Sequence, residues 1–434
     1  MKCFGDILGT YVCDNKYVEN ACKIHQIKER KIEMKRFYRG MSLFFAIALM
    51  LSLLSIPAAA LPSGSQDYIV VGGSGTFSVY QAASGTTDYS QYSKISDFST
   101  MTLALNYIGN LVQDGSTTIT FGETFSSADG PSGWCDVGSD VAAVNGGGMS
   151  FSIGSSGTYT VKGKLTGSGD YVLSFQMYLI GIIDGAEIQS TSTSANSCAV
   201  ASIMSDVTVK PGSVITASTG SALHMFDAGA AYIEGGTLTG GTSESAIYDE
   251  SIHALNISGG TVSSDSTYAV YNSGTGAVNI SGGAVRSSAS NTIYNNSTGK
   301  ITISDQADIS TSSRYAAVWL HGGTSGETIL EMTGGTVSNT NASSFQLTDA
   351  NVPTAIGNGS VGTVLISGGS IQSTGFGVGS SSSAVLKISG GTINVGENGF
   401  GVANGSTGGV YLSGSPTITG GRANLVEARS GSIH

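Results

Sequence analysis

The sequence predicts an all-β fold: a parallel β-helix with about 22–24 residues per coil and a short cap helix near its N-terminal end. Residues 255–271 read LNISGGTVSSDSTYAVY, and residues 278–294 read VNISGGAVRSSASNTIY, 23 residues further along. The chain contains 63 glycines and only 11% charged residues, yet 40% of its residues are hydrophobic. A repeat of this length with enough apolar residues for a core indicates stacked coils, neither a globule nor a disordered tail.

Each repeat contains three apolar positions that recur from coil to coil. The step between successive units is 22 to 24 residues, apart from two steps of 29 and 34. The first column comprises Val207, Ala231, Leu255, Val278, Ile301, Leu330, Val364, Leu386 and Val410. The second column comprises Val214, Leu238, Val262, Val285, Ile309, Val337, Ile371, Ile393 and Ile418. The third column comprises Leu223, Ile247, Val270, Ile293, Val318, Ile356, Val378 and Val402.

The short segments around these positions alternate between apolar and other residues, which is the period of a β-strand. Three strands and three turns fit one coil, and each strand then pairs with its equivalent in the next coil, about 4.8 Å away. The Gly-Gly pair of each repeat suits a corner, because glycine adopts positive φ at little steric cost. The two long steps read as insertions within turns, at 321–327 and within 338–355, and stacked coils tolerate such insertions. Ten or eleven coils are expected.

The recurring segments NISGGTV, NISGGAV, LISGGSI and KISGGTI resemble the coils of exported bacterial right-handed parallel β-helix proteins. This broad group includes enzymes of the pectate-lyase fold and adhesin-like surface proteins. The resemblance covers roughly residues 180–420. It implies a right-handed, single-stranded parallel β-helix, and it says little about activity.

Residues 1–60 read as a leader. The basic segment MKRFYRG (34–40) precedes the apolar run MSLFFAIALMLSLLS (41–55), and IPAAA (56–60) supplies the small residues of a cleavage site. This order predicts a signal peptide that is cleaved after Ala60, with Met34 as an alternative start. The alternative is an uncleaved membrane anchor within 41–60, although the run is short for a spanning helix. The sequence therefore predicts a secreted or cell-surface protein.

Residues 61–180 are expected to form an N-terminal cap and irregular first coils. The segment 96–111 has apolar residues at helical spacing, and Asp97 or Ser99 would cap it. Residues 181–434 are expected to form the regular β-helix. The chain stops at SGSIH directly after coil-like sequence, which indicates a fragment or a longer native protein.

The charge balance is acidic. Nine of the 19 basic residues and five of the 30 acidic residues lie within 1–60, which leaves ten basic and 25 acidic residues and a net charge of −15. An acidic surface argues against nucleic acid as a partner, because phosphate binding needs a basic face. Only Cys135 and Cys198 remain beyond residue 60, as a disulfide or as two buried thiols.

One column of aromatic residues gives the candidate binding site. If the third apolar column points inward, the residues that follow it point outward. On five successive coils these residues are His224, Tyr248, Tyr271, Tyr294 and Trp319, after which the column becomes Gly357, Gly379 and Ala403. The rings could bind a polysaccharide or a cell-wall glycan by stacking on sugar rings, or they could form a structural ladder. Asp249, Asn272 and Asn295 follow this column and read as turn residues or as a short asparagine ladder.

Catalytic patterns are weak in this sequence. Arg286, Lys300 and Arg314 are not placed beside carboxylates by the repeat register, and no His/Cys spacing typical of a zinc site is present. No metal and no cofactor are expected. The expected function is adhesion or carbohydrate binding without a chemical step. A polysaccharide lyase or glycoside hydrolase on the same scaffold is the first alternative, and a passive structural stalk is the second.

Overall fold

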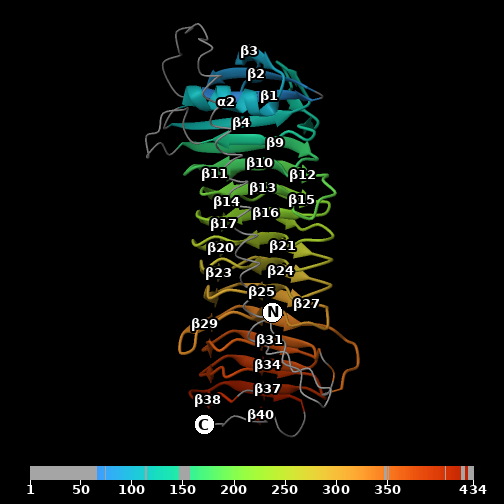
Figure 1. Ribbon diagram of the computed structural model, residues 1–434, viewed down its shortest axis with the longest axis vertical. Helices are drawn as coiled ribbons and strands as arrows, with labels where there is room; N and C mark the ends of the chain where they lie inside the picture. Colours follow the sequence, from blue (N-terminus) through green and yellow to red (C-terminus); the bar gives the residue numbers. More distant parts are fainter. Residues whose placement is uncertain are drawn as a thin grey trace, which may run out of the picture. The chain divides into compact units, whose positions relative to one another are not determined.

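The computed structural model describes residues 66–73, 75–112, 115–145, 157–346, 349, 351–405, 407–421 and 426–428. These residues form an all-β parallel β-helix of about 11 coils with roughly 24 residues per coil. Figure 1 shows the strands of successive coils stacked one above the other. The predicted fold class is confirmed.

Each regular coil contributes three strands, and each strand pairs in parallel with its equivalent in the next coil. The first strands of the coils are β11 (Ile180–Ile183), β14 (Asp206–Val209), β17 (Ala231–Ile233), β20 (Leu255–Ile257), β23 (Val278–Ile280), β26 (Ile301–Ile303), β29 (Thr328–Met332), β32 (Thr363–Ile366), β35 (Leu386–Ile388) and β38 (Val410–Leu412). The second strands are β12 (Glu187–Ser190), β15 (Val214–Ala217), β18 (Thr237–Thr239), β21 (Thr261–Ser264), β24 (Ala284–Ser287), β27 (Asp308–Thr311), β30 (Thr336–Asn339), β33 (Ser370–Ser373), β36 (Thr392–Val395) and β39 (Thr417–Gly420).

The third strands form a separate 12-stranded parallel sheet, which we call the lateral sheet. Its strands are β8 (Ala142–Asn145), β10 (Tyr171–Gln176), β13 (Cys198–Ile203), β16 (Ser221–Phe226), β19 (Ile247–Asp249), β22 (Val270–Asn272), β25 (Ile293–Asn295), β28 (Val318–Leu320), β31 (Thr354–Asn358), β34 (Phe376–Ser380), β37 (Phe400–Asn404) and β40 (Val426–Ala428).

The first and second strands belong to one 26-stranded sheet, because the long strand β9 (Thr158–Gly167) joins them. Its first half pairs with β11 and its second half with β12. Beyond β9 the sheet continues through β4 (Ser116–Gly122) and β7 (Cys135–Asp136) to β1 (Gln66–Gly73). The antiparallel strands β2 (Thr76–Ala83) and β3 (Ser93–Phe98) then follow, and β5 (Thr124–Ser126) and β6 (Gly130–Ser132) form a separate pair.

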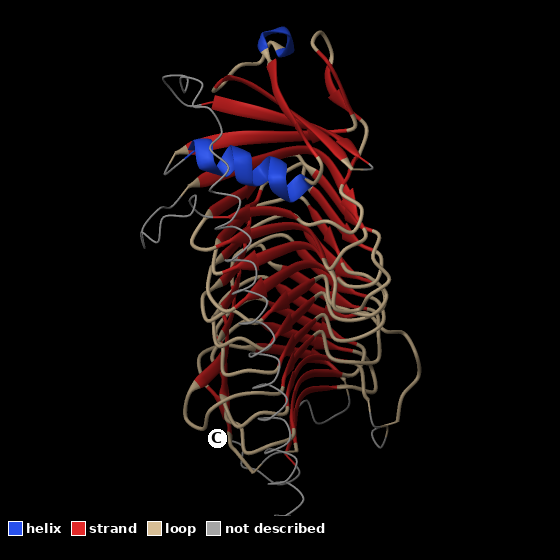
Figure 2. Ribbon diagram, turned by 45° about the horizontal axis from the view of Figure 1, so that its top comes forward, coloured by secondary structure: helices blue, strands red, loops and turns tan. Residues whose placement is uncertain are grey.

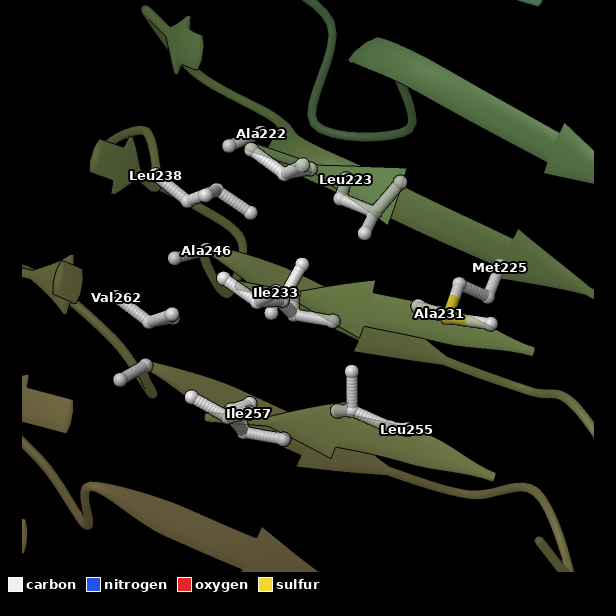
Figure 3. Close-up of a cluster of buried hydrophobic side chains, with 14 of the residues drawn as sticks. Ala222, Leu223, Met225, Ala231, Ile233, Leu238, Ala246, Leu255, Ile257 and Val262 are labelled. Atoms are coloured by element: carbon white, nitrogen blue, oxygen red, sulfur yellow. The ribbon is translucent and has the colours of Figure 1, made fainter. Parts of the chain in front are cut away.

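The core lies between the sheets. Ile247, Val270 and Ile293 are stacked in register and have no solvent exposure. Figure 3 shows the same arrangement for Leu223, Leu238 and their neighbours, whose side chains point into the space enclosed by the coil. Burial of a column of branched side chains along the whole stack supplies the main driving force for this fold.

The second column needs one correction. Val214 was expected to point inward, but it is 38% exposed and pairs with Thr237, whereas Ile215 is fully buried and pairs with Leu238. The segment Val214-Ile215 offers two adjacent apolar residues, so the alternation of the sequence does not decide which one faces the core. The other predicted positions of this column, Leu238 to Ile418, stand in register.

The helix α2 spans Met101–Val112, and a 3-10 helix spans Tyr89–Gln91. The helix is shorter than expected at its start, because residues 96–98 belong to β3. Thr100 caps it, since its Oγ1 accepts a hydrogen bond from the Leu103 amide at 3.2 Å, so the expected caps Asp97 and Ser99 are wrong. Met101, Leu105 and Ile108 are buried in the core, and Figure 2 shows the helix beside the first coils.

The leader and its alternatives lie outside the described residues, as does the SGSIH segment. In the described part of the chain, no helix is long and apolar enough to cross a membrane. Cys135 and Cys198 are both buried and carry free thiols, which decides the question that the sequence left open.

Candidate functional site

The predicted aromatic column lies on the outer face of the lateral sheet. His224, Tyr248, Tyr271, Tyr294 and Trp319 are register partners on β16, β19, β22, β25 and β28. All five side chains are half-buried, and the aliphatic residues before them face the core. The predicted orientation of this column is therefore correct.

Four of the five rings form a continuous ladder. The ring centroids of His224 and Tyr248 lie 4.6 Å apart, those of Tyr248 and Tyr271 5.0 Å, and those of Tyr271 and Tyr294 5.6 Å. Tyr268 packs against the last two rings from the turn before β22. Rings at these separations stabilise one another, so this part of the column has a structural contribution of its own.

The electrostatics of the ladder follow from its partial burial. Burial raises the pKa of Tyr248 to about 12, and the carboxylate of Glu250 acts in the same direction. Burial also raises the pKa values of Tyr268 and Tyr294. Tyr248, Tyr268 and Tyr294 therefore carry neutral phenols at physiological pH, whose hydroxyl groups can both donate and accept hydrogen bonds. At the first ring of the ladder, His224 Nε2 lies 3.4 Å from Glu250 Oε2.

Trp319 occupies a different setting, over two glycines. A Cβ atom at Gly357 would come within 2.5 Å of Trp319 Cε3, and one at Gly359 within 2.9 Å of Trp319 Cζ2. The indole ring therefore lies across the strand that follows its own. The aromatic column ends at Gly357 because the space of a side chain there is taken by the tryptophan.

A cleft of about 720 Å³ opens over this part of the lateral sheet. Its floor is formed by β25, β28, β31, β34 and β37, so it is about 19 Å long at the ~4.8 Å spacing of neighbouring strands. Its aromatic lining comprises Tyr268, Tyr294, Tyr315, Trp319 and Phe376. The remaining lining consists mostly of serine, asparagine, glycine and alanine. Such a cleft offers ring faces and hydrogen-bonding groups side by side.

The longer insertion forms one wall of the cleft. Asp349, Asn351 and Val352 of this insertion line the cleft. Arg314 ties the insertion to the preceding coil, because its Nη2 donates to Ser344 O at 3.0 Å and its Nη1 lies 3.9 Å from Asp349 Oδ2. Arg314 and Asp349 are the charged residues of the cleft lining, and they face each other. Charge is therefore balanced within the cleft.

The repeat register did not reveal the carboxylate partners of Arg286, Lys300 and Arg314. Each forms an ion pair with a carboxylate of a following coil, and the partners are Asp308, Glu331 and Asp349. These pairs run diagonally between coils or reach into the insertion, so a comparison of equivalent positions could not find them. In the described ranges, no group of three His, Cys, Asp or Glu side chains is placed to hold a metal ion.

The sequence identified Tyr294 and Trp319 but missed Tyr268, Tyr315 and Phe376. These three do not belong to the aromatic column, and they approach the cleft from the turns or from the strand β34. Phe376 recurs as Phe400 in the next coil, which is a repeat that the sequence offers, whereas Tyr268 and Tyr315 lie in turns outside the repeated columns.

Comparison of the chain with protein-family models, with curated proteins and with solved structures finds no match.

Proposed function

We propose that this protein is a non-catalytic binding module that holds a neutral, linear polysaccharide in the lateral cleft. The observation that carries the proposal is the cleft itself, where Trp319, Tyr294 and Phe376 stand beside hydroxyl and amide groups along five strands. The apolar faces of sugar rings stack on aromatic rings, and their hydroxyl groups need hydrogen-bonding partners of the kind that serine and asparagine supply.

The charges favour an uncharged ligand. Arg314 and Asp349 neutralise each other in the cleft, so neither a polyanion nor a polycation gains from binding there. The chain has a net charge of −11, which also repels acidic polymers at a distance. The cleft extends along the stack of coils, which suits a chain that lies parallel to the stack and makes several weak contacts.

We further propose that the protein is exported and acts in secreted form or at the cell surface, in the manner of the adhesin-like β-helix proteins whose coils it resembles. The apolar run 41–55 and the alanines at 58–60 support export. An extended lateral surface supports a role in attachment to glycans outside the cell.

A glycan array followed by titration calorimetry on the full chain tests the binding proposal. Truncation of a central aromatic residue typically costs at least about 2 kcal/mol, so Trp319→Ala should weaken binding of a neutral glycan roughly 30-fold. Tyr248→Ala is the matched control, because Tyr248 belongs to the same column, does not line the cleft and contacts no ring that does. The affinity of this variant for the glycan should stay within about 2-fold of that of the unmodified protein. Absence of binding by the unmodified protein would refute the proposal. Equal affinity in the Trp319→Ala variant would exclude the cleft as the site.

A further inference from the structure

A column of polar side chains runs inside the stack of coils, at the corner where the lateral sheet ends. Asp249, Asn272 and Asn295 are register partners at this position, and none of the three has solvent exposure. They are the residues that the sequence left as turn residues or as an asparagine ladder. The structure shows a buried ladder whose first member is an aspartate.

The orientation of the amide of Asn295 is fixed by a carbonyl group, and it fixes in turn the orientation of the amide of Asn272. Asn295 Nδ2 donates to the carbonyl oxygen of Gly299 at 2.7 Å, and only an NH₂ group can make that bond. Asn295 Oδ1 therefore faces the preceding coil, where it accepts a hydrogen bond from Asn272 Nδ2 at 2.9 Å.

Asn272 cannot be turned around without loss. Its Nδ2 also lies 3.2 Å from Ser297 Oγ, and the hydroxyl hydrogen of Ser297 is used by Asn295 Oδ1 at 3.1 Å. A rotated amide would therefore place the Asn272 oxygen against two acceptors. Asn272 Oδ1 is left on the other side, and among the described groups it has no hydrogen-bond donor.

We propose that Asp249 is a proton-binding site: in the folded protein its carboxyl group is protonated, and its Oδ2 hydroxyl donates to Asn272 Oδ1. Within the described part of the chain, Asp249 Oδ2 and Asn272 Oδ1 are both buried without a partner, and their residues are neighbours in the ladder. One proton satisfies both oxygens. It also repeats the bond that Asn272 makes to Asn295 one coil further on.

The surroundings favour the neutral acid. Burial raises the pKa of Asp249 to about 7, the Ser251 amide that donates to Oδ1 at 2.9 Å opposes this shift, and the adjacent Glu250 adds to it. His253 of the same corner accepts a hydrogen bond from the Gly229 amide through Nδ1.

The residues opposite Asp249 on the neighbouring strands are Met225 and Asn272, neither of which is charged. Further away in the preceding corner lies Asp227, and on the outer face Glu250 is engaged with His224. A cation that would stabilise the ionised carboxylate is absent from these described neighbours.

The consequence is a stability that depends on pH. The pKa of Asp249 is raised in the folded state, so between about pH 4 and pH 7 the folded protein keeps a proton that the unfolded chain releases. The stabilisation by this proton is complete at the acidic end of the range, is lost progressively as the pH rises from about 4 to about 7, and is gone above about pH 7. Above that pH an unpaired buried charge remains next to Tyr248 of the aromatic ladder.

The test compares unfolding of the full chain with that of Asp249→Asn between pH 5 and pH 8. The asparagine donates to Asn272 Oδ1 at every pH, so it imitates the protonated state. We expect the unfolding constant of the unmodified protein, relative to the variant, to rise about tenfold per pH unit from pH 5 to pH 7. Glu250→Gln, which removes the neighbouring exposed carboxylate, should keep this slope.

Parallel pH profiles for the unmodified protein and Asp249→Asn would overturn the proposal. A second measurement does not depend on a variant that folds. Infrared spectra at pH 6, where exposed carboxylates are ionised, should show the carbonyl stretch of one protonated carboxylic acid, and its absence would also overturn the proposal. Neither result depends on whether the cleft binds a glycan.

Discussion

Gly357 and Gly379 show how much one equivalent position can differ between coils. Both follow the third apolar column, and they are register partners on β31 and β34. A Cβ atom at Gly357 would lie 2.5 Å from the indole ring of Trp319, whereas a Cβ atom at Gly379 would have its nearest neighbour at 3.6 Å, in ordinary contact with Thr354. Gly357 is therefore required, because any larger residue would clash with Trp319. Gly379 has room for a larger side chain.

This difference predicts the outcome of two alanine substitutions. Gly357→Ala should push the indole of Trp319 off the lateral sheet, move its fluorescence emission to longer wavelength, and weaken binding in the cleft. Gly379→Ala should leave emission unchanged, since its methyl group would make only ordinary contacts, with Thr354 and Phe376, and would not approach the indole. The measurement is fluorescence in a Trp134→Phe background, so that only one tryptophan reports. A shift of equal size in both variants would contradict this account of the cleft.

At the scale of the element, a strand of this fold is defined by which of its residues faces the core. β15 reads VITA, and its first two residues are both apolar. A slip of one residue exchanges the two faces of a strand, so the choice between Val214 and Ile215 is a choice between two registers. The neighbouring strands decide it: Ile215 continues the column that runs through Leu238 and Val262.

Two truncations in β15 measure that choice. Ile215→Ala removes a fully buried side chain and should lower the free energy of unfolding by about 2–5 kcal/mol. Val214→Ala removes an exposed one and should change it by less than about 0.5 kcal/mol. Urea denaturation followed by circular dichroism gives both values. If Val214→Ala is the more destabilising substitution, then Val214 and not Ile215 faces the core, as expected from the sequence.

At the scale of the whole solenoid, the regular repeat predicted the fold. The candidate site is formed largely by the longer insertion and by aromatic residues outside the repeated columns. The first and third apolar columns were predicted from sequence, because each repeats an aliphatic residue at a nearly constant step. The cleft could not be predicted, because Asp349 and Val352 belong to an insertion without a repeat partner, and its position beside Trp319 depends on contacts made by Arg314. Asp249, Asn272 and Asn295 were predicted as turn residues or as a short asparagine ladder. Each is instead the last residue of its strand, so alternation places it on the same inward side as Ile247, Val270 and Ile293.

The stack also predicts how the protein responds to loss of one coil. Deletion of residues 255–277 removes β20, β21 and β22 and joins Ala254 to Val278, which takes the register position of Leu255. Each coil contacts mainly its neighbours, so the shortened protein should fold, keep its β-sheet signal per residue, and lose roughly one tenth of its denaturant m-value. Deletion of residues 255–266 is the control, because it brings Thr267 to the position of Leu255 and places polar residues in the core columns. That variant should fail to give a cooperative transition. If both deletions fold equally well, the columns do not specify the register, and the fold depends on something other than the stacked aliphatic core.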